Sequence, residues 1–511
     1  MEAVAAALGE LATPEGAALL VAGCLLALAL GILPGLSSTE AMVILLPFTF
    51  GLALEPSMIL LSAAYASAFV GGALTSIVFG IPGTSTGLAT PLDGHPLHRQ
   101  GRTIYAVTAA AIASALGGFL SLALVVALMP VIEPVSLLFG PAEWFAFVIF
   151  GLVVLAFSQE GSFLKGLISA GIGLLLSVIG LSVITGMPRY TFGVTELWGG
   201  VPIVAAFVGL YPMTEALDMA LRDRGRAAAR EGLVLPSLDR AETRRQMREG
   251  VSDTLRHGRQ WTLAGLVGWF VGVIPGVGGV LANILGYLVV RQTSRERARF
   301  GHGDVRGLIG SEAANNGSVG GALVPALALG IPGSLNTAIL LGVFMINGVQ
   351  PGTNIFAENL DVTWLILLSV AAATVLSAAI VLAGGWRLVS VISRLRPAAV
   401  APAILFLGCL AVLLARGNPF DLVFAAALAG LGLAMKRHGF SRIALVIALM
   451  LGPLVESSFF QALAIGRGSF AVFVATPTSI LLWTAVAAAL VLHLLNARTA
   501  LLPRLGRTGK E

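Results

Sequence analysis

Charged residues are scarce in this chain of 511 residues. Asp, Glu, Lys and Arg together make up 11% of the sequence, whereas hydrophobic residues make up 57%. A soluble globular domain carries about 25% charged residues, so this composition excludes an ordinary soluble protein. Apolar stretches of about 20 residues recur along the chain, long enough to cross a hydrocarbon core of about 30 Å as helices. The sequence therefore predicts a polytopic membrane protein.

Other features are also missing. Only two cysteines occur, Cys24 and Cys409, and both lie in apolar segments, which argues against a disulfide framework or a cysteine metal site. Segments of about ten residues with alternating polarity are absent, which argues against a membrane β-barrel. The N-terminus lacks the basic flank of a cleavable signal peptide, so we expect the first apolar segment to remain in the protein.

Basic residues gather in loops, and basic loops of membrane proteins stay in the cytoplasm. The net charge of +5 is therefore interpreted as topology information and does not predict nucleic-acid binding. The clearest cytoplasmic loops are 221–260 and 291–306, both rich in arginine. The segment before residue 17 and the segment 350–361 carry acidic residues and no Arg or Lys, so they are placed outside. The complete scheme predicts a periplasmic N-terminus and a cytoplasmic C-terminus.

The phrase G-I-P-G occurs twice, at 80–83 and at 330–333. A related Pro-Gly pair precedes each copy, at 34–35 and at 275–276. Proline removes a backbone donor and glycine loosens a helix, so each phrase is predicted to interrupt a helix inside an apolar region. Interruptions at corresponding positions of two halves indicate the substrate site of a transporter. Loops at matched positions of the two copies carry opposite charge, which predicts that the halves are inverted in the membrane.

The expected fold is an all-α polytopic integral membrane protein, an inverted-repeat secondary transporter with about 11 crossings and about 2 re-entrant hairpins. Each arm of the second hairpin has only about a dozen residues, which is short for a span at about 1.5 Å per residue. Two thin spans remain the alternative to each hairpin. The expected parts are a first inverted repeat over 1–220, with hairpin 17–54 and broken segment 57–97; a basic cytoplasmic linker over 221–260; a second inverted repeat over 261–457, with hairpin 261–290 and broken segment 308–349; and a C-terminal span with a basic tail over 458–511.

The polar residues around the interruptions are small and uncharged. Several directly follow Pro-Gly, where a new helix is expected to begin, and the free amides of a helix start can bind an anion without a cationic side chain. Small polar residues also pack helices together, and that alternative stays open for each of them. The predicted substrate-binding residues are Ser37, Ser38, Thr39, Pro82, Gly83, Thr84, Ser85, Thr86, Asn315, Asn316, Pro332, Gly333, Ser334, Asn336 and Thr337.

A carboxylate substrate would need a co-bound cation, because no Arg or Lys interrupts the hairpins or the broken segments. Unwound carbonyl groups near Gly35, Gly83, Gly276 and Gly333 are the predicted sodium ligands, and no other metal or cofactor is expected. Glu40 is a further candidate for the coupling ion. A carboxylate at membrane depth is a functional candidate, whereas a wet position at the hairpin rim would make it structural, and both interpretations stay open.

Two other acids have alternative interpretations. Glu312 is either a residue at the cytoplasmic end of a helix or a proton carrier. Asp93 is interpreted as a turn former, because the second half keeps Asn347 at the like place without the charge. No second intramembrane Asp is placed to partner Asp93, and no His or Lys is placed to activate a serine. An intramembrane enzyme is therefore not expected, and an ion-conducting channel is the other alternative to a carrier.

Two stretches carry a family resemblance: 71–102, with G-G-A-L…G-I-P-G-T-S…L-D-G-H-P…Q-G-R, and 311–352, with S-E-A-A-N-N-G…G-I-P-G-S…N-G-V-Q-P-G. The chain resembles the large permease subunit of the tripartite tricarboxylate transporters over nearly its whole length. The resemblance implies a secondary transporter of the bacterial inner membrane that imports tricarboxylates or related carboxylates. It also implies elevator-like motion, a sodium or proton gradient as the driving force, and two partners, a small membrane subunit and a periplasmic solute-binding protein. No Walker-type G-x-x-x-x-G-K-[ST] occurs, consistent with transport that does not use ATP. Homo-oligomerisation stays open.

Overall fold

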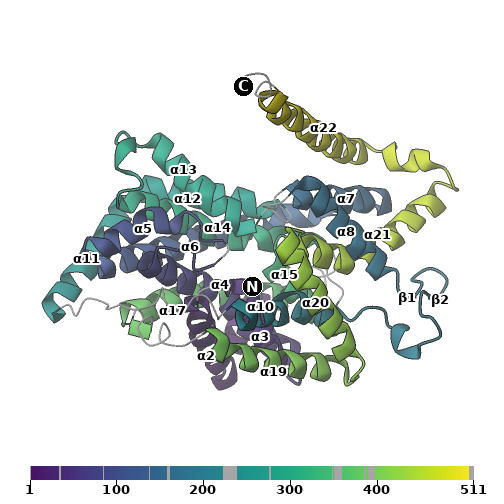
Figure 1. Cartoon of the computed structure of the whole chain (residues 1–511), viewed down its shortest axis with the longest axis horizontal. Coiled ribbons are helices and arrows are strands. Elements are labelled where there is room, and N and C mark those ends of the chain that lie inside the picture. Colours follow the sequence, from purple (N-terminus) through teal and green to yellow (C-terminus); the bar gives the residue numbers. More distant parts are fainter. Residues whose placement is uncertain are drawn as a thin grey trace, which may run out of the picture. The chain divides into compact units, whose positions relative to one another are not determined.

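The computed structural model describes residues 2–33, 36–84, 86–136, 139–157, 162–222, 239–274, 278–347, 349, 359–384, 387–388 and 397–505 (Figure 1). Contacts divide the chain into two compact units. The first contains Met1–Glu133 and Val201–His438, and the second contains Pro134–Gly200 and Gly439–Glu511. The division into two repeats and a linker stays a prediction.

The first unit consists of helices. They are α1 (Glu2–Ala12), α2 (Pro14–Ile32), α3 (Ser38–Leu45), the 3₁₀ turn η1 (Leu46–Thr49), α4 (Leu54–Phe79), α5 (Thr90–Arg99), α6 (Thr103–Ser136, whose last turn belongs to the second unit), α9 (Ile203–Val208), the π-helical η3 (Gly209–Met213), α10 (Thr214–Arg222), α11 (Arg240–Arg256), α12 (Gly258–Val273), α13 (Gly278–Thr293), η6 (Arg297–Arg299), α14 (Val305–Leu329), α15 (Leu335–Ile346), α17 (Leu360–Leu382), α19 (Pro397–Arg416) and α20 (Asp421–His438).

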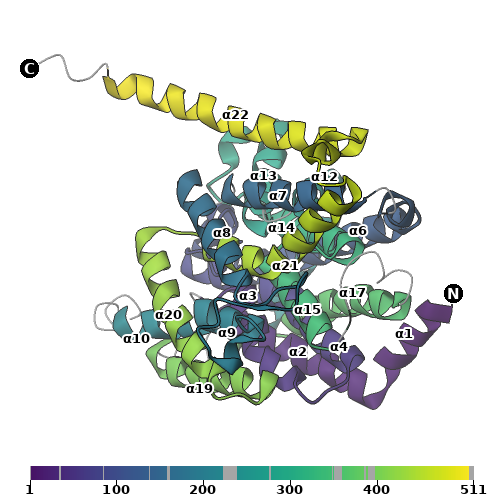
Figure 2. The ribbon, with the colours of Figure 1, turned by 90° about the vertical axis from the view of Figure 1, so that its right-hand side faces the viewer.

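The second unit has fewer elements. They are α7 (Pro141–Phe157), α8 (Phe163–Ser177), the short antiparallel strands β1 (Gly180–Leu181) and β2 (Pro188–Arg189), η2 (Thr195–Leu197), α21 (Arg442–Ile465), η8 (Phe470–Val474) and α22 (Pro477–Leu505). In this unit α8 packs along α21 (Figure 2). Arg189 forms a bidentate ion pair with Glu456, with N–O distances of 2.7 and 2.8 Å.

The all-α membrane class is confirmed. Among the described residues, 6 helices are long and apolar enough to cross a membrane, and β1 and β2 form the one sheet. The number of crossings stays a prediction. Helix α14 has 25 residues but is not among these 6, because it carries several polar side chains. Nearly all of them are buried, so the polar groups of α14 face other protein segments.

Two pairs of helices pack in the same way. Helix α2 lies against α4, and α12 lies against α14, with glycines at both contacts. A Cβ atom added at Gly71 would lie 3.1 Å from the Cα atom of Gly31, and one at Gly321 would lie 2.9 Å from the Cα atom of Gly272. Gly71 and Gly321 each precede a G-I-P-G phrase by the same number of residues. Within each pair, residues further along one helix contact residues further along the other, so the two helices of each pair run parallel.

The predicted hairpins correspond to α2–α3 and α12–α13. Helices α12 and α13 have 16 residues each, so the expectation of about a dozen residues per arm was too short. The two arms of the first hairpin differ in length, because α2 has 19 residues and α3 has 8. The tips at Pro34–Gly35 and Pro275–Gly276 lie outside the described residues. Whether these arms form re-entrant hairpins or thin spans stays a prediction.

Candidate functional site

The helix break at the first G-I-P-G is confirmed. Helix α4 ends at Phe79, and Gly80 takes the left-handed conformation with φ of 69°. The chain then folds back onto α4, where the Gly83 amide donates to the hydroxyl of Ser76 at 2.8 Å. A Cβ atom at Gly83 would lie 2.1 Å from the carbonyl oxygen of Gly72. Only glycine permits this close return.

The break at the second G-I-P-G repeats this geometry. Helix α14 ends at Leu329, and Gly330 is left-handed with φ of 65°. A Cβ atom at Gly333 would lie 2.7 Å from the Cα atom and 2.8 Å from the carbonyl oxygen of Ala322. Ala322 precedes Gly333 by the same interval that separates Gly72 from Gly83. Both Pro-Gly turns, including Pro82 and Pro332, therefore return to the same place on the helix they leave.

The segments after the two breaks differ. After the second, Ser334 caps α15 as predicted, and its backbone amide donates to the Thr337 hydroxyl at 2.9 Å. After the first, α5 begins only at Thr90, so the expectation that Thr84 to Thr86 cap a helix was wrong. Pro91 in the first turn of α5 explains the later start, since proline is favoured there. The hydroxyls of Thr84 and Thr86 instead lie 3.1 Å apart in a non-helical segment, and Ser85 between them lies outside the described residues.

Glu40 completes a capping box at the start of α3. Its carboxylate accepts from the Ser37 backbone amide at 2.7 Å and from the Ser37 hydroxyl. Both residues belong to a buried helix start rather than to a wet rim. This contact gives Glu40 a structural task, and its role as a coupling-ion ligand stays a prediction.

Helices α3 and α15 meet at their N-terminal ends through Asn336 (Figure 2). The Asn336 side-chain oxygen accepts from the Thr39 hydroxyl at 2.9 Å, and its amide donates to the Ser38 hydroxyl at 2.8 Å. The Tyr65 hydroxyl of α4 lies 3.3 Å from that of Ser334. Five of the predicted substrate residues are thus gathered in one group, made by a helix of the first half and a helix of the second, in which all but the half-buried Ser334 are buried: Ser38, Thr39, Ser334, Asn336 and Thr337.

A second cross-contact joins α13 to the start of α5, and its central residue was missed from the sequence. The Asn283 side chain accepts from the Ala89 amide at 2.7 Å and donates to the Thr90 hydroxyl at 3.2 Å. It also donates to the Ser311 carbonyl oxygen at 3.1 Å. A polar amide inside the second hairpin was the available sequence signal. In each cross-contact, one asparagine joins the second helix of one half's predicted hairpin to the segment after the break in the other half. Asn336 joins α3 to α15, and Asn283 joins α13 to the start of α5.

Asn315 and Asn316 lie on α14 and are both buried. The Asn315 side-chain oxygen has no hydrogen-bond partner in the described structure. It points to the place where a Cβ atom at Gly279 would lie 3.0 Å from it and 3.0 Å from the Thr86 methyl group. Asn316 donates to the Glu312 carbonyl oxygen at 3.4 Å, a weak contact within its own helix. An unpaired buried acceptor beside the first break fits a site that awaits a ligand, since such groups are rarely left unpaired.

Glu312 is fully buried in the body of α14, so its interpretation as a helix-end residue was wrong. Its two carboxylate oxygens accept from the hydroxyls of Thr90 on α5 and Ser114 on α6, the latter at 3.0 Å. Among the described residues it forms no ion pair.

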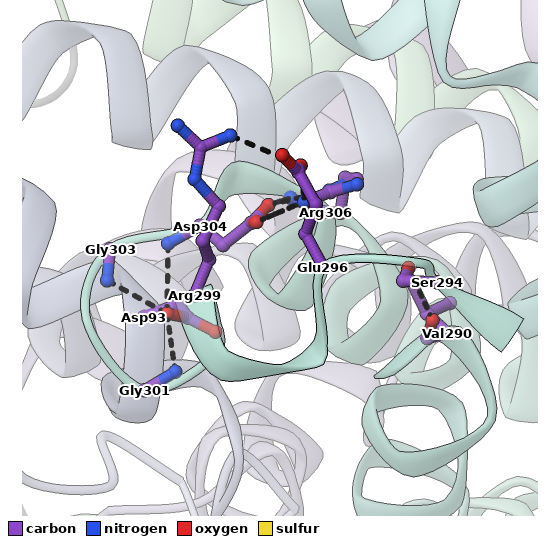
Figure 3. Close-up of polar contacts among 9 residues, drawn as sticks. All are labelled: Asp93, Val290, Ser294, Glu296, Arg299, Gly301, Gly303, Asp304 and Arg306. Atoms are coloured by element: carbon purple, nitrogen blue, oxygen red, sulfur yellow. Dashed lines mark hydrogen bonds and ion pairs between the residues drawn. The ribbon is translucent and has the colours of Figure 1, made fainter. Parts of the chain in front are cut away.

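Asp93 lies within α5 and not in a turn, so the turn interpretation was wrong. One of its carboxylate oxygens accepts from three backbone amides of the loop before α14, those of Gly301, Gly303 and Asp304, at 2.8 to 2.9 Å (Figure 3). Burial opposes ionisation of Asp304 in this loop, but hydrogen bonds from Arg306 and its charge outweigh it and lower the pKa of Asp304. Asp93 therefore anchors a loop of the second half to a helix of the first.

Two of the predicted sodium ligands have no described position. Gly35 and Gly276 lie outside the described residues. Within the described part of the chain, no group of three or more His, Cys, Asp or Glu residues could hold a metal ion.

Comparison with known proteins identifies the family. A 52.8 kDa uncharacterised protein from the TAR-I ttuC' 3' region of Agrobacterium vitis is 32% identical over 487 residues, which cover 94% of each chain. An uncharacterised protein from the TAR-II ttuC' 3' region of the same organism is 33% identical over 214 residues, 41% of this chain and 86% of that protein. No solved structure matches significantly. The sequence model of the tripartite tricarboxylate transporter TctA family matches residues 18–447. The chain therefore belongs to the TctA family, the large membrane subunits of tripartite tricarboxylate transporters.

Proposed function

We propose that this chain is the permease of a binding-protein-dependent secondary transporter that imports tricarboxylates or related carboxylates. The family is a transporter family and not an enzyme family, and it implies a small membrane subunit and a periplasmic binding protein as partners. The observation that carries the proposal is the pair of matched Pro-Gly breaks, each joined by an asparagine to the opposite half. Broken helices that meet in this way surround the substrate site in carriers with internal repeats.

The site suits an anion that brings its own counter-ion. Helix α15 presents its N-terminal amides beside small hydroxyl side chains, and a helix N-terminus favours a bound carboxylate. The unpaired Asn315 oxygen and the hydroxyls of Thr84 and Thr86 are neutral acceptors that suit a cation. We propose a bacterial inner-membrane location and a sodium or proton gradient as the driving force.

Uptake by the reconstituted transporter tests the proposal. The chain and its two partners in proteoliposomes should accumulate radiolabelled citrate, succinate or an aromatic carboxylate when a sodium or proton gradient is imposed. Collapsing both gradients with ionophores should stop accumulation. Uptake that continues unchanged without either gradient would contradict coupling and favour a channel, which the broken helices could also form.

We also propose that the two halves are inverted, with the N-terminus outside and the C-terminus inside. Three contacts support this arrangement at the cytoplasmic end. Gln100 donates to the His302 carbonyl oxygen at 2.9 Å, Arg102 pairs with Glu249 at 3.1 Å, and Tyr105 bonds the α11 residue Asp253 at 2.8 Å. These contacts bring together three segments that the positive-inside pattern assigns to the cytoplasm.

Contacts at the opposite, periplasmic end also support the inverted arrangement. Ala7 of α1, Ile59 near the start of α4 and Leu365 near the start of α17 form one apolar cluster. The flanks of these three helices are the segments predicted to lie outside. Helix α4 thus starts at this end, and α14 starts beside Asp93 at the other. The two broken helices therefore run in opposite directions, as inverted repeats require.

Cysteine labelling measures this sidedness. Cys24 is buried, so replacing Cys409 with serine gives a background with no accessible thiol. In that background we expect Ser252→Cys to react with a membrane-impermeant maleimide only from the cytoplasmic face. Asn359→Cys should react only from the periplasmic face. Labelling of both positions from one face would contradict the inverted arrangement.

A further inference from the structure

The charge environment of Glu312 is unusual for a buried acid. Its side chain is fully buried, and its two described partners are neutral hydroxyl groups, from Thr90 and Ser114. An unpaired charge inside protein is costly, and a buried carboxyl group without a cation usually takes up a proton instead. An acid inside a membrane protein with no structural ion pair is a candidate for proton transfer.

The groups packed around Glu312 do not prevent its carboxyl group from releasing a proton. Helix α13 contributes Asn283, a neutral amide, and Tyr287, which lies one turn further along. Helix α5 contacts Glu312 through Thr90, whereas its Asp93 binds the loop before α14. The histidines of α5 have other partners, the Ile77 carbonyl oxygen for His95 and the Thr103 hydroxyl for His98. Helix α12 carries no acidic residue, and its single ionisable side chain, Arg259, is at its first turn. No described Lys, Arg or His lies within ion-pair distance of Glu312 to fix it in the ionised form.

The hydrogen bonds around Glu312 accommodate both protonation states. The Thr90 hydroxyl accepts from Asn283, so its own proton is directed to one oxygen of Glu312. The Ser114 hydroxyl can donate to the other oxygen when Glu312 is ionised, and can turn to accept when that oxygen carries the proton. A proton can therefore bind and leave without breaking the packing.

Glu312 is also placed to link its proton to an anion. Asn315 and Asn316 follow it by three and four residues on α14, which puts their Cβ atoms about 5–6 Å away on the same side of the helix. Thr90 begins the helix after the first break. An ionised Glu312 would disfavour a carboxylate bound between the two breaks, and a protonated one would not. Proton and anion then favour each other's binding, and such coupling is reciprocal.

We propose that Glu312 carries the coupling proton, so that import of the carboxylate is proton symport. The inference rests on the proposed transport function and names its coupling ion. Glu312 binds a proton together with the substrate and releases it when the substrate leaves, and no covalent bond other than the O–H bond of Glu312 forms or breaks.

Infrared spectroscopy of the full chain in lipid nanodiscs tests the titration without any transport. The other acidic residues also give carboxyl bands at acidic pH, so the measured quantity is the difference spectrum between the unmodified protein and Glu312→Gln. We expect this difference to contain the carbonyl stretch of one protonated carboxyl group at acidic pH and to lose it as the pH is raised. Glutamine can keep both hydrogen bonds, so this variant should fold. Glu312→Asp should retain a titrating band, and Glu15→Gln, a change in the exposed first turn of α2, should leave the band unchanged.

Three results would overturn the proposal. They are a carboxyl band that is the same in the unmodified protein and in Glu312→Gln, a difference band that does not change with pH, and a difference band that sodium removes at constant pH, which would indicate a sodium site. A second measurement uses the chain with both partners in proteoliposomes and radiolabelled citrate as the probe. Glu312→Gln should lose the stimulation of uptake by an inward proton gradient, and full stimulation in that variant would also overturn the proposal. If citrate is not transported, the measurement is repeated with succinate and an aromatic carboxylate. If none of the three is transported, the proposed function fails while the infrared result still decides whether Glu312 titrates.

Discussion

Gly83→Leu and Gly333→Leu are each expected to reduce substrate uptake to background while the protein still inserts into the membrane. A Cβ atom at Gly83 would lie 2.1 Å from a backbone oxygen of α4, and one at Gly333 would lie 2.7 Å from a backbone carbon of α14. Ordinary contact begins near 3.4 Å, so the first turn must move by about 1.3 Å and the second by about 0.7 Å. Binding groups tolerate displacements of only about 0.5 Å, so the loss of transport should be nearly complete.

Alanine variants separate the effect of the first added carbon atom from the effect of a large side chain. Gly83→Ala and Gly333→Ala should already lower uptake strongly, because the first added carbon makes the collision. Two controls match them, one in each half. A Cβ atom at Gly87 has its nearest neighbour at 3.4 Å, and one at Gly342 has its nearest at 3.9 Å. Gly87→Ala and Gly342→Ala should therefore transport normally.

Uptake in proteoliposomes and the yield of folded protein by size-exclusion chromatography measure the two quantities separately. Normal transport by both leucine variants would show that the Pro-Gly turns do not shape the site. Loss of transport in the two control variants would show that any added carbon in these segments is harmful, and the argument from close packing would fall.

The sequence predicted the interruptions because their cause is local. Proline and glycine end a helix whatever surrounds them, and both breaks are where G-I-P-G places them. The start of the next helix depends on longer-range contacts. The first copy continues to Thr90 before a helix begins, since Asn283 of the other half takes the Ala89 amide and Pro91 sets the first turn. No pattern near Thr84 records that contact.

The acidic residues show the same limit of prediction from sequence. A carboxylate in an apolar segment can be recognised from sequence, but its task depends on its partners. Glu40 completes a cap three residues from Ser37, which its spacing could have indicated as a capping box. Asp93 and Glu312 have partners roughly two hundred residues away, at Gly301 and Ser114, for which spacing gives no sign. Asp93 was therefore misread as a turn former, and of the two alternatives for Glu312 the helix-end interpretation was wrong.

Asn336→Ala is the second variant for which we expect a large effect. It removes the two hydrogen bonds that join α15 to α3 and leaves the hydroxyls of Ser38 and Thr39 without these partners. A buried polar group left unpaired costs about 1–3 kcal/mol, so thermal unfolding in detergent should shift clearly downward. Uptake should fall further than stability alone explains, because the two helix N-termini are no longer held together.

Asn283→Ala should act in the same way at the other cross-contact, where three hydrogen bonds are lost. Asn347→Ala is the matched control. Its amide donates to the Val343 carbonyl oxygen of its own helix at 2.8 Å, and among the described residues no hydrogen bond joins it to the other half. We expect that variant to unfold and transport as the unmodified protein does.

A double-mutant cycle between Asn336→Ala and Thr39→Val isolates the bridge itself. Thr39 donates directly to Asn336, so the two changes should not add, and groups in direct contact typically couple by about 0.5–3 kcal/mol. The same cycle between Asn347→Ala and Thr39→Val should give no coupling energy. Additive losses in the first cycle would mean that Asn336 does not bind α3 in the membrane. The two halves would then have to meet through other residues, and the paired breaks would no longer define one site.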